Sequence, residues 1–135
     1  MKILVDTCVW SQVLRRKNPN RELTNKLKDL IKDGRVSIVG PIRQELLSGI
    51  SDVKQFKKLN ESLSSFEDIP LKSEYFIKAA EFSNICRVKG IQGATTDFLI
   101  CAVAFLQNLL IFTTDADFKK YKKYLPINLF QWSIV

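Results

Sequence analysis

The sequence contains no histidine. This absence excludes serine–histidine–aspartate triads, histidine general bases and histidine-ligated zinc sites. Cysteine is also scarce: Cys8, Cys86 and Cys101 are widely spaced and form no CxxC pair, so the pattern predicts neither a disulfide framework nor a zinc knuckle. Such sparse use of cysteine is typical of the reducing cytosol, and we therefore expect a cytoplasmic protein.

Long apolar runs are missing as well. The longest uncharged stretch lies between Asp97 and Asp115, and it is interrupted by Gln107 and Asn108. A membrane span needs about 20 apolar residues, and the apolar run at the N-terminus is too short for a signal peptide. We therefore expect no membrane partner, and we interpret the long stretch as a buried helix, a turn and a buried strand.

Glycine and proline are infrequent, with 5 and 4 residues among 135, which excludes a collagen-like chain. The hydrophobic fraction of 46% and the charged fraction of 26% argue against disorder and predict one globular domain over residues 1–135. Basic residues number 21 and acidic residues 14, a net charge of +7. This excess suits a polyanionic partner such as RNA.

Short apolar runs alternate with segments of helical periodicity. Strands are expected at residues 2–5, 36–39, 66–69, 109–112 and 127–130. Asn20 is a predicted helix cap, and Thr95 or Thr96 is the predicted cap of the helix that runs through Leu106. Strands that alternate with helices favour an α/β fold, a three-layer α/β/α sandwich around a mainly parallel sheet.

Acidic residues recur where this fold predicts the carboxyl ends of strands. Asp6 directly follows the first strand, Asp115 and Asp117 follow the strand at 109–112, Glu45 lies in the first turns of the helix after the second strand, and Asp97 begins the long late helix. Taken singly, most of these acids have an ordinary interpretation as helix caps or partners of a helix dipole. Ligands of open parallel sheets bind at this end, so the whole set favours a site.

Several carboxylates that face one small space repel each other, and some must take up protons unless a cation neutralises them. Hard divalent cations such as Mg²⁺ and Mn²⁺ prefer oxygen ligands. Two such ions about 3.5–4 Å apart can clamp the attacking and leaving oxygens of a phosphodiester, and this chemistry needs no histidine. Asp117 has three open interpretations: a ligand, a residue behind the ligands, or a solvated charge.

Without the five acids named above, the chain has 21 basic and 9 acidic groups, a net charge of +12. An acidic pocket in a basic surface suits a polyanion that approaches a bound metal. The residues that we consider for RNA contact are Lys119, Lys120, Lys122, Lys123, Arg15 and Arg16, although such charges are most often a solvated surface. Tyr121 and Tyr124 add aromatic faces suited to single-stranded bases. Trp132 has two open interpretations, packing on the sheet or at a dimer seam.

Four motifs occur in order: DTCVW at residues 6–10, PIRQEL at 41–46, DFLICA at 97–102 and LIFTTDADF at 110–118. Together they resemble those of PIN-domain ribonucleases and, given the chain length, of VapC-type toxins of type II toxin–antitoxin pairs. The resemblance implies a Mg²⁺- or Mn²⁺-dependent endoribonuclease, a phosphodiester hydrolase that cleaves single-stranded regions of RNA.

The resemblance also implies the roles of individual residues. Asp6, Glu45, Asp97 and Asp115 match the catalytic, metal-binding carboxylates, and Asp117 matches a more variable acidic position that we include among the metal residues. Thr7 and Thr113 match hydroxyl residues that support these carboxylates. Cys8 departs from the pattern, because many family members have Ser or Asn there; we expect it not to be a ligand. The partners implied are RNA, a cognate antitoxin protein and a second copy of the chain in a homodimer.

Three alternatives stand beside this interpretation. One is a non-catalytic RNA- or protein-binding module that keeps the fold, and another is a general RNA-processing nuclease without an antitoxin. A phosphatase of the haloacid dehalogenase type also places Asp after its first strand, but it needs a second Asp two residues later, where this chain has Cys8.

Overall fold

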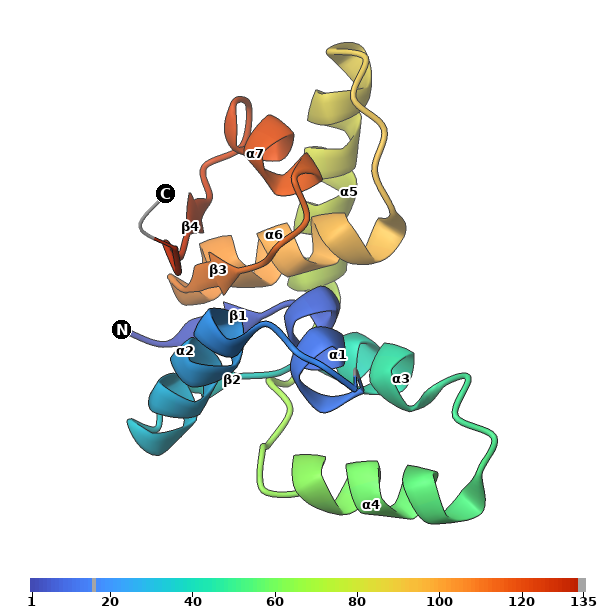
Figure 1. Ribbon diagram of the computed structural model, residues 1–135. Helices are drawn as coiled ribbons and strands as arrows, with labels where there is room; N and C mark the ends of the chain where they lie inside the picture. The colour runs from blue at the N-terminus through green and yellow to red at the C-terminus, as the bar shows by residue number, and fades with distance from the viewer. Residues whose placement is uncertain (16, 134–135) are drawn as a thin grey trace.

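The computed structural model describes residues 1–15 and 17–133 (Figure 1). One residue considered for RNA contact, Arg16, therefore lies outside the described residues. The elements are β1 (Ile3–Val5), α1 (Thr7–Leu14), α2 (Arg21–Lys32), β2 (Val36–Ser37), α3 (Gly40–Leu47), α4 (Val53–Leu63), α5 (Ser73–Val88), α6 (Thr95–Gln107), β3 (Leu110–Phe112), α7 (Asp117–Lys122) and β4 (Asn128–Leu129).

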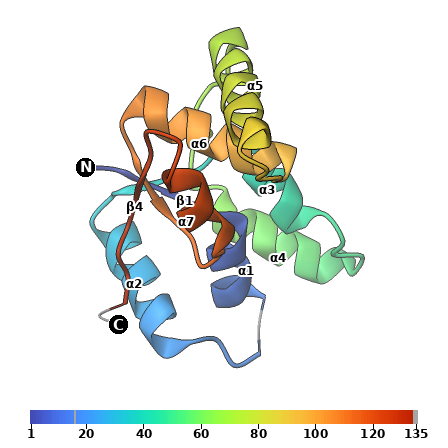
Figure 2. The same ribbon diagram turned by 90° about the horizontal axis from the view of Figure 1, so that it is seen from above.

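The four strands form one sheet in the order β2-β1-β3-β4, and every neighbouring pair is parallel. Figure 2 shows α5 and α6 on one side of the strands and α1 and α2 on the other. The predicted α/β/α sandwich with a parallel sheet is thus confirmed. The strand predicted at residues 66–69 is wrong, because only an isolated parallel bridge between Ile38 and Asp68 forms there.

Local sequence signals explain several helix boundaries. Asn20 caps α2 as predicted, because its side-chain oxygen accepts a hydrogen bond from the backbone N–H of Leu23 at 3.1 Å. Proline in the first turn of α3 costs no hydrogen bond, since that N–H would have no helical partner. The predicted threonine caps of α6 are wrong: Ala94 is the N-cap residue, and no side chain there accepts a hydrogen bond from the helix.

The core lies on both faces of the sheet. All three residues of β1 are fully buried, and α6 buries seven consecutive residues from Phe98 to Ala104. A helix buried on every side is fixed by packing around its whole circumference. Asp6 and Asp97, which stand at the ends of these two elements, are therefore held by the most buried parts of the molecule. Among the described residues, no helix combines the length and apolar character needed to cross a bilayer.

Candidate metal centre

Asp6 is fixed at the carboxyl end of β1. The register pairs Val5 with Phe112, and the backbone N–H of Asp6 donates to the carbonyl oxygen of Phe112 at 2.9 Å. Its side chain caps α1 by accepting from the backbone N–H of Thr7 at 2.7 Å, and it also accepts from the hydroxyl of Thr113 at 2.8 Å. Only 6% of Asp6 is exposed, so the first strand, the first helix and the end of β3 hold its carboxylate in place.

The turn after β3 positions Asp115 and Asp117. The hydroxyl of Thr113, which donates to Asp6, accepts a hydrogen bond from the backbone N–H of Asp115 at 3.0 Å. Asp115 in turn accepts from the backbone N–H of Asp117 at 2.9 Å through Oδ1. Ala116, and not Asp115, is the N-cap residue of α7, but the side chain of Asp115 accepts from the first backbone N–H of that helix. The second carboxylate oxygen of Asp115, Oδ2, is not used in that hydrogen bond.

Asp97 lies in the first turn of α6 and accepts a hydrogen bond from the hydroxyl of Tyr121 at 2.7 Å. The side chain of Tyr121 is fully buried and packs between Phe98 and Phe118, with ring centroids 5.1 and 5.2 Å away. The prediction that Tyr121 presents an aromatic face to RNA is therefore wrong. Its spacing from Phe118 along α7 was the available signal for a buried position.

Three carboxylates converge at this end of the sheet. One oxygen from each of Asp97, Asp115 and Asp117 lies within 4.8 Å of the other two. Asp6 lies close enough to Asp97 and Asp115 for mutual electrostatic repulsion, although it is not part of that tight group. In the described part of the chain, the one ion pair that these acids make joins Asp117 to Lys120 at 3.7 Å. Asp6, Asp97 and Asp115 therefore share a space with no compensating lysine or arginine.

The electrostatics follow from burial. Desolvation raises the pKa of Asp6, and the negative charge of Asp115 adds to this effect, while hydrogen bonds from Thr113 and Thr7 oppose it. Desolvation likewise raises the pKa of Asp97, with contributions from Asp6, Asp115 and Asp117, while the hydrogen bond from Tyr121 lowers it. Burial and mutual repulsion thus both disfavour the charged forms of these two acids, a condition that a bound cation would relieve.

Glu45 stands apart from the three-carboxylate group. It is exposed on α3, and it lines a shallow hollow together with Thr7 and Thr96, each of which precedes or follows a site aspartate in the chain. The hydroxyl oxygen of Thr7 is buried and has no hydrogen-bond partner among the described residues. Hard divalent cations prefer oxygen ligands, and their bound waters donate hydrogen bonds to carboxylate and hydroxyl oxygens. The residues present therefore fit such an ion.

Asp6 and Asp115 lie at the place in the sheet where parallel α/β folds bind ligands. The chain runs from β1 to β2 on one side and later to β3 on the other, so the topology reverses between β1 and β3. Open parallel sheets bind ligands in the crevice at such a switch point, beyond the carboxyl ends of the strands. Asp6 follows β1 and Asp115 follows β3, so both flank this crevice.

Comparison with known proteins identifies the family of the chain. The model of the PIN domain family matches residues 3–124. The chain belongs to the PIN domain family. A comparison with curated protein sequences found no match.

Solved structures share the fold of this PIN domain at low sequence identity. FitAcB from Neisseria gonorrhoeae superposes with a TM-score of 0.79 at 24% identity, covering 98% of this chain and 99% of the other. VapBC2 from Rickettsia felis, solved bound to a DNA fragment from its promoter, gives 0.80 at 22% identity, with 98% and 100% covered. DNA-bound VapBC from Salmonella typhimurium gives 0.78 at 15% identity, with 98% and 99% covered.

Cys8 takes part in the hydrogen-bond network of this PIN domain. Its thiol lies 3.4 Å from Asp6 Oδ2 and 3.4 Å from the hydroxyl of Thr113, and it accepts from the backbone N–H of Thr114 at the same distance. Burial and the charge of Asp6 raise the pKa of this thiol. Cys8 is half-buried and packs against the core, so it is both a core residue and a member of this polar network. The expectation that it is not a metal ligand stays a prediction.

The basic residues considered for RNA contact separate into groups. Lys119 and Lys122 line a cavity that also contains Asp115, whereas Lys120 pairs with Asp117. Arg15 follows the last residue of α1, at the end of that helix opposite Asp6, and it lines a different hollow beside α4. Among these residues, only Lys119 and Lys122 share a cavity with one of the site carboxylates.

Proposed function

We propose that this PIN domain is a metal-dependent endoribonuclease that cleaves single-stranded regions of RNA, and that it is the toxin of a toxin–antitoxin pair. The observation that carries the nuclease proposal is the group of Asp97, Asp115 and Asp117, whose oxygens lie within 4.8 Å of one another beside the buried Asp6. Lys120 pairs with Asp117, but no ion pair joins Asp97 or Asp115 to a described lysine or arginine, and carboxylates held this close favour a divalent cation among them.

The proposed metal residues are Asp6, Glu45, Asp97, Asp115 and Asp117. Asp97, Asp115 and Asp117 lie close enough together to share Mg²⁺ or Mn²⁺, the buried Asp6 stands beside them, and the exposed Glu45 lies apart. Bound there, the ion would lower the pKa of a coordinated water and neutralise charge on the phosphodiester. Thr113 fixes Asp6 and the Asp115 turn through two hydrogen bonds, and Tyr121 orients the carboxylate of Asp97.

Charge supports RNA as the substrate class. Apart from the five candidate site acids, the chain carries a net charge of +12, which attracts a polyanion. The candidate centre itself is acidic, so the phosphate that contacts the carboxylates would need a bound cation between it and them. This contrast suits a phosphodiester whose phosphate meets the ion while neighbouring phosphates meet lysines.

The toxin part of the proposal rests on the family and on the named structural relatives. Those relatives are FitAcB and two VapBC structures, and another similar structure, VapBC-5 from Mycobacterium tuberculosis, is described as a member of the VapBC family of toxin–antitoxin systems. We infer by analogy that this chain acts in the cytoplasm, forms a homodimer and is inhibited by a cognate antitoxin.

The nuclease proposal is tested with single-stranded RNA, Mg²⁺ or Mn²⁺, and a chelator. We expect cleavage that the chelator abolishes, and a loss of at least about 100-fold in Asp6→Asn, Asp97→Asn and Asp115→Asn. Asp33→Asn is the matched control, because Asp33 is an exposed acid at the end of α2. Cleavage that survives chelation, or that equals wild type in Asp6→Asn, would contradict a metal-dependent nuclease.

Calorimetry with Mn²⁺ separates the nuclease from a non-catalytic module, because a module that retains only capping acids would take up no ion at millimolar concentration. The toxin proposal has its own test. Induced expression should arrest growth, and co-expression of the product of a neighbouring gene should restore it. Growth arrest that no neighbouring product relieves would instead favour a general RNA-processing nuclease.

A further inference from the structure

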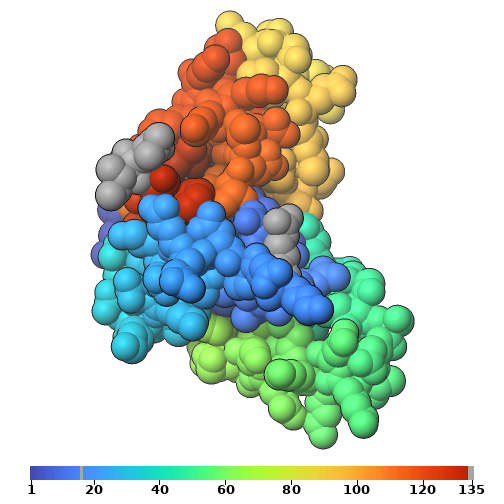
Figure 3. Space-filling view, viewed as in Figure 1, coloured from blue at the N-terminus to red at the C-terminus, as the bar shows by residue number. Residues whose placement is uncertain are grey.

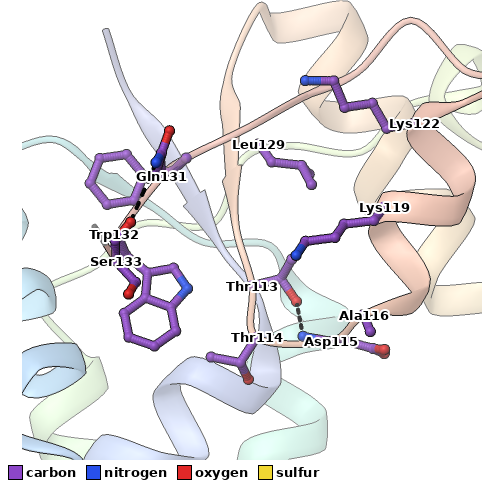
Figure 4. A pocket seen from close by; sticks show the side chains of 11 residues that line it. Thr113, Thr114, Asp115, Ala116, Lys119, Lys122, Leu129, Gln131, Trp132 and Ser133 are labelled. Atoms are coloured by element: carbon purple, nitrogen blue, oxygen red, sulfur yellow. Dashed lines mark hydrogen bonds between the residues drawn. The ribbon is translucent and has the colours of Figure 1, made fainter. Parts of the chain in front are cut away.

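A cavity of about 480 Å³ opens beside the candidate metal centre (Figure 4). Three parts of the chain contribute to it: the turn after β3, one face of α7 and the segment after β4. Its main polar and aromatic lining consists of Thr113, Thr114, Asp115, Lys119, Lys122 and Trp132. Because Asp115 belongs both to this cavity and to the three-carboxylate group, the two sites are continuous.

Trp132 forms one wall of the cavity, and Figure 4 shows its indole across from Lys119. The residue is half-buried, and its ring centroid lies 6.4 Å from that of Phe112 in β3, with the planes inclined by 35°. Trp132 therefore packs on the sheet, as one of its two interpretations predicted, and its place at a dimer seam stays a prediction. An aromatic ring held by the core while it lines a cavity is a preformed stacking surface.

The lysines on α7 face two ways. Lys119 and Lys122 are three residues apart, the spacing that places side chains on one face of a helix, and both line the cavity. Lys120 points to Asp117 instead and forms an ion pair with it. The cavity thus brings together two cations and an aromatic face, the combination that binds single-stranded nucleic acid through phosphates and base stacking.

One polar group in the cavity is already fixed. The hydroxyl of Thr114 accepts a hydrogen bond from the side-chain amide of Gln12 at 2.8 Å, so α1 anchors this wall. The cavity volume lies within the range of small-molecule sites, about 300–1,000 Å³. A nucleotide in the cavity would extend along the wall between Trp132 and α7 and would end at Asp115.

We propose that this cavity binds one unpaired nucleotide of the RNA next to the phosphodiester that is cut. The base stacks on Trp132, and Lys119 and Lys122 contact the flanking phosphates. This inference rests on the proposed function for the identity of the polymer, and it adds the subsite that selects single-stranded RNA. A base in a duplex is stacked between its neighbours, so it does not offer a free face to Trp132 as an unpaired base does.

Binding is measured in a chelator, so that it does not depend on metal or on cleavage. Trp10 and Trp132 are the two tryptophans of the chain, and only 1% of Trp10 is exposed. In the Trp10→Phe variant, indole fluorescence reports on Trp132 alone. We expect a short single-stranded RNA to quench this fluorescence in a saturable manner and the matched duplex to quench it much less. Equal quenching by both, or none by either, would overturn the proposal.

Affinity variants provide the second measurement. We expect Trp132→Ala and the pair Lys119→Ala/Lys122→Ala each to weaken RNA binding about 10-fold or more, and Trp132→Phe to retain most of the affinity. In the Lys119→Ala/Lys122→Ala variant, the slope of log affinity against log salt concentration should also be less steep by about 1.4, because two phosphate contacts are lost. Lys54→Ala/Lys57→Ala is the control with equal loss of charge, since both lysines are exposed on α4.

The outcomes separate this inference from the proposed function. Metal-dependent cleavage together with unchanged RNA affinity in the cavity variants would overturn the nucleotide subsite and leave the nuclease intact. Quenching and weakened variants without any cleavage would support the subsite and count against the nuclease. Should the cavity variants lose affinity for the antitoxin while they keep full affinity for RNA, the cavity is a protein-binding site and the proposal is wrong.

Discussion

Tyr121 links the hydrophobic core to the candidate metal centre. Its ring is fully buried, and its hydroxyl donates to the carboxylate of Asp97. Gly93 lies directly against that hydroxyl: a Cβ at this position would overlap the hydroxyl oxygen and would stand 2.9 Å from the ring carbon that carries it. The absence of a side chain at Gly93 therefore allows Tyr121 to reach Asp97.

We expect Gly93→Ala to displace Tyr121 and to break its hydrogen bond to Asp97. Because the ring is packed on both sides, the overlap should destabilise the fold by about 1–3 kcal/mol. It should also weaken metal binding, since Asp97 loses the group that orients it. Thermal denaturation and Mn²⁺ calorimetry measure the two effects. Gln92→Ala is the neighbouring control, and equal melting temperatures for the two variants would contradict the role assigned to Gly93.

Most strands and helices were predictable from the chain itself. Short apolar runs between helical segments identify β1, β2, β3 and β4, and Asn20 was a sound cap because its side chain needs only a neighbour three residues away. The start of α6 was not predictable from threonine preference. Ala94 is the N-cap residue there without a side-chain cap, and the burial of the middle of α6, Phe98 to Ala104, is what holds the helix in place.

The candidate site was predictable to the extent that it depends on topology. Parallel strands bring the residues after β1 and β3 to one edge, so the proximity of Asp6 and Asp115 follows from the alternation of elements. The hydrogen bond between Tyr121 and Asp97 depends instead on how α7 crosses α6, which no local pattern encodes. The same holds for Cys8, whose contacts come from residues more than a hundred positions away.

The two buried carboxylates, Asp6 after β1 and Asp97 in the first turn of α6, also determine how stability varies with pH. Burial raises the pKa of Asp6 and of Asp97 in the folded state above their ordinary value of 3.8. The folded protein therefore holds these protons more tightly than the unfolded chain does. Their contribution to stability is fully present below the ordinary value and is lost as the pH rises through the raised values.

We therefore expect the metal-free protein to lose stability, as far as these two groups contribute, as the pH rises above their ordinary pKa of 3.8. Asp6→Asn should melt at a higher temperature than wild type at neutral pH, because it removes a buried charge and keeps an oxygen that can cap α1. Thermal denaturation in a chelator measures this, with Asp33→Asn as the control. An Asp6→Asn protein that melts lower at neutral pH would show that the carboxylate stabilises the fold.

The whole molecule combines a basic surface with an acidic centre. This distribution predicts that salt acts on RNA binding and much less on folding, because a screened surface charge contributes little to stability. With about four phosphate contacts, the affinity for single-stranded RNA should fall with salt at a log–log slope of about −3. Titrations at several salt concentrations, beside melting curves under the same conditions, measure both. A slope near zero would contradict electrostatic binding of RNA.

The two carboxylates that flank the switch point come from opposite ends of the chain, Asp6 after the first strand and Asp115 after the third. In the space-filling view, the blue surface of the early helices adjoins the orange and red surface of the last third of the chain (Figure 3). A polypeptide still under synthesis consequently lacks Asp97, Asp115 and Asp117 until long after β1 and the early helices have been made. If the protein cuts RNA, the early part of the chain by itself cannot assemble the group of carboxylates that does so.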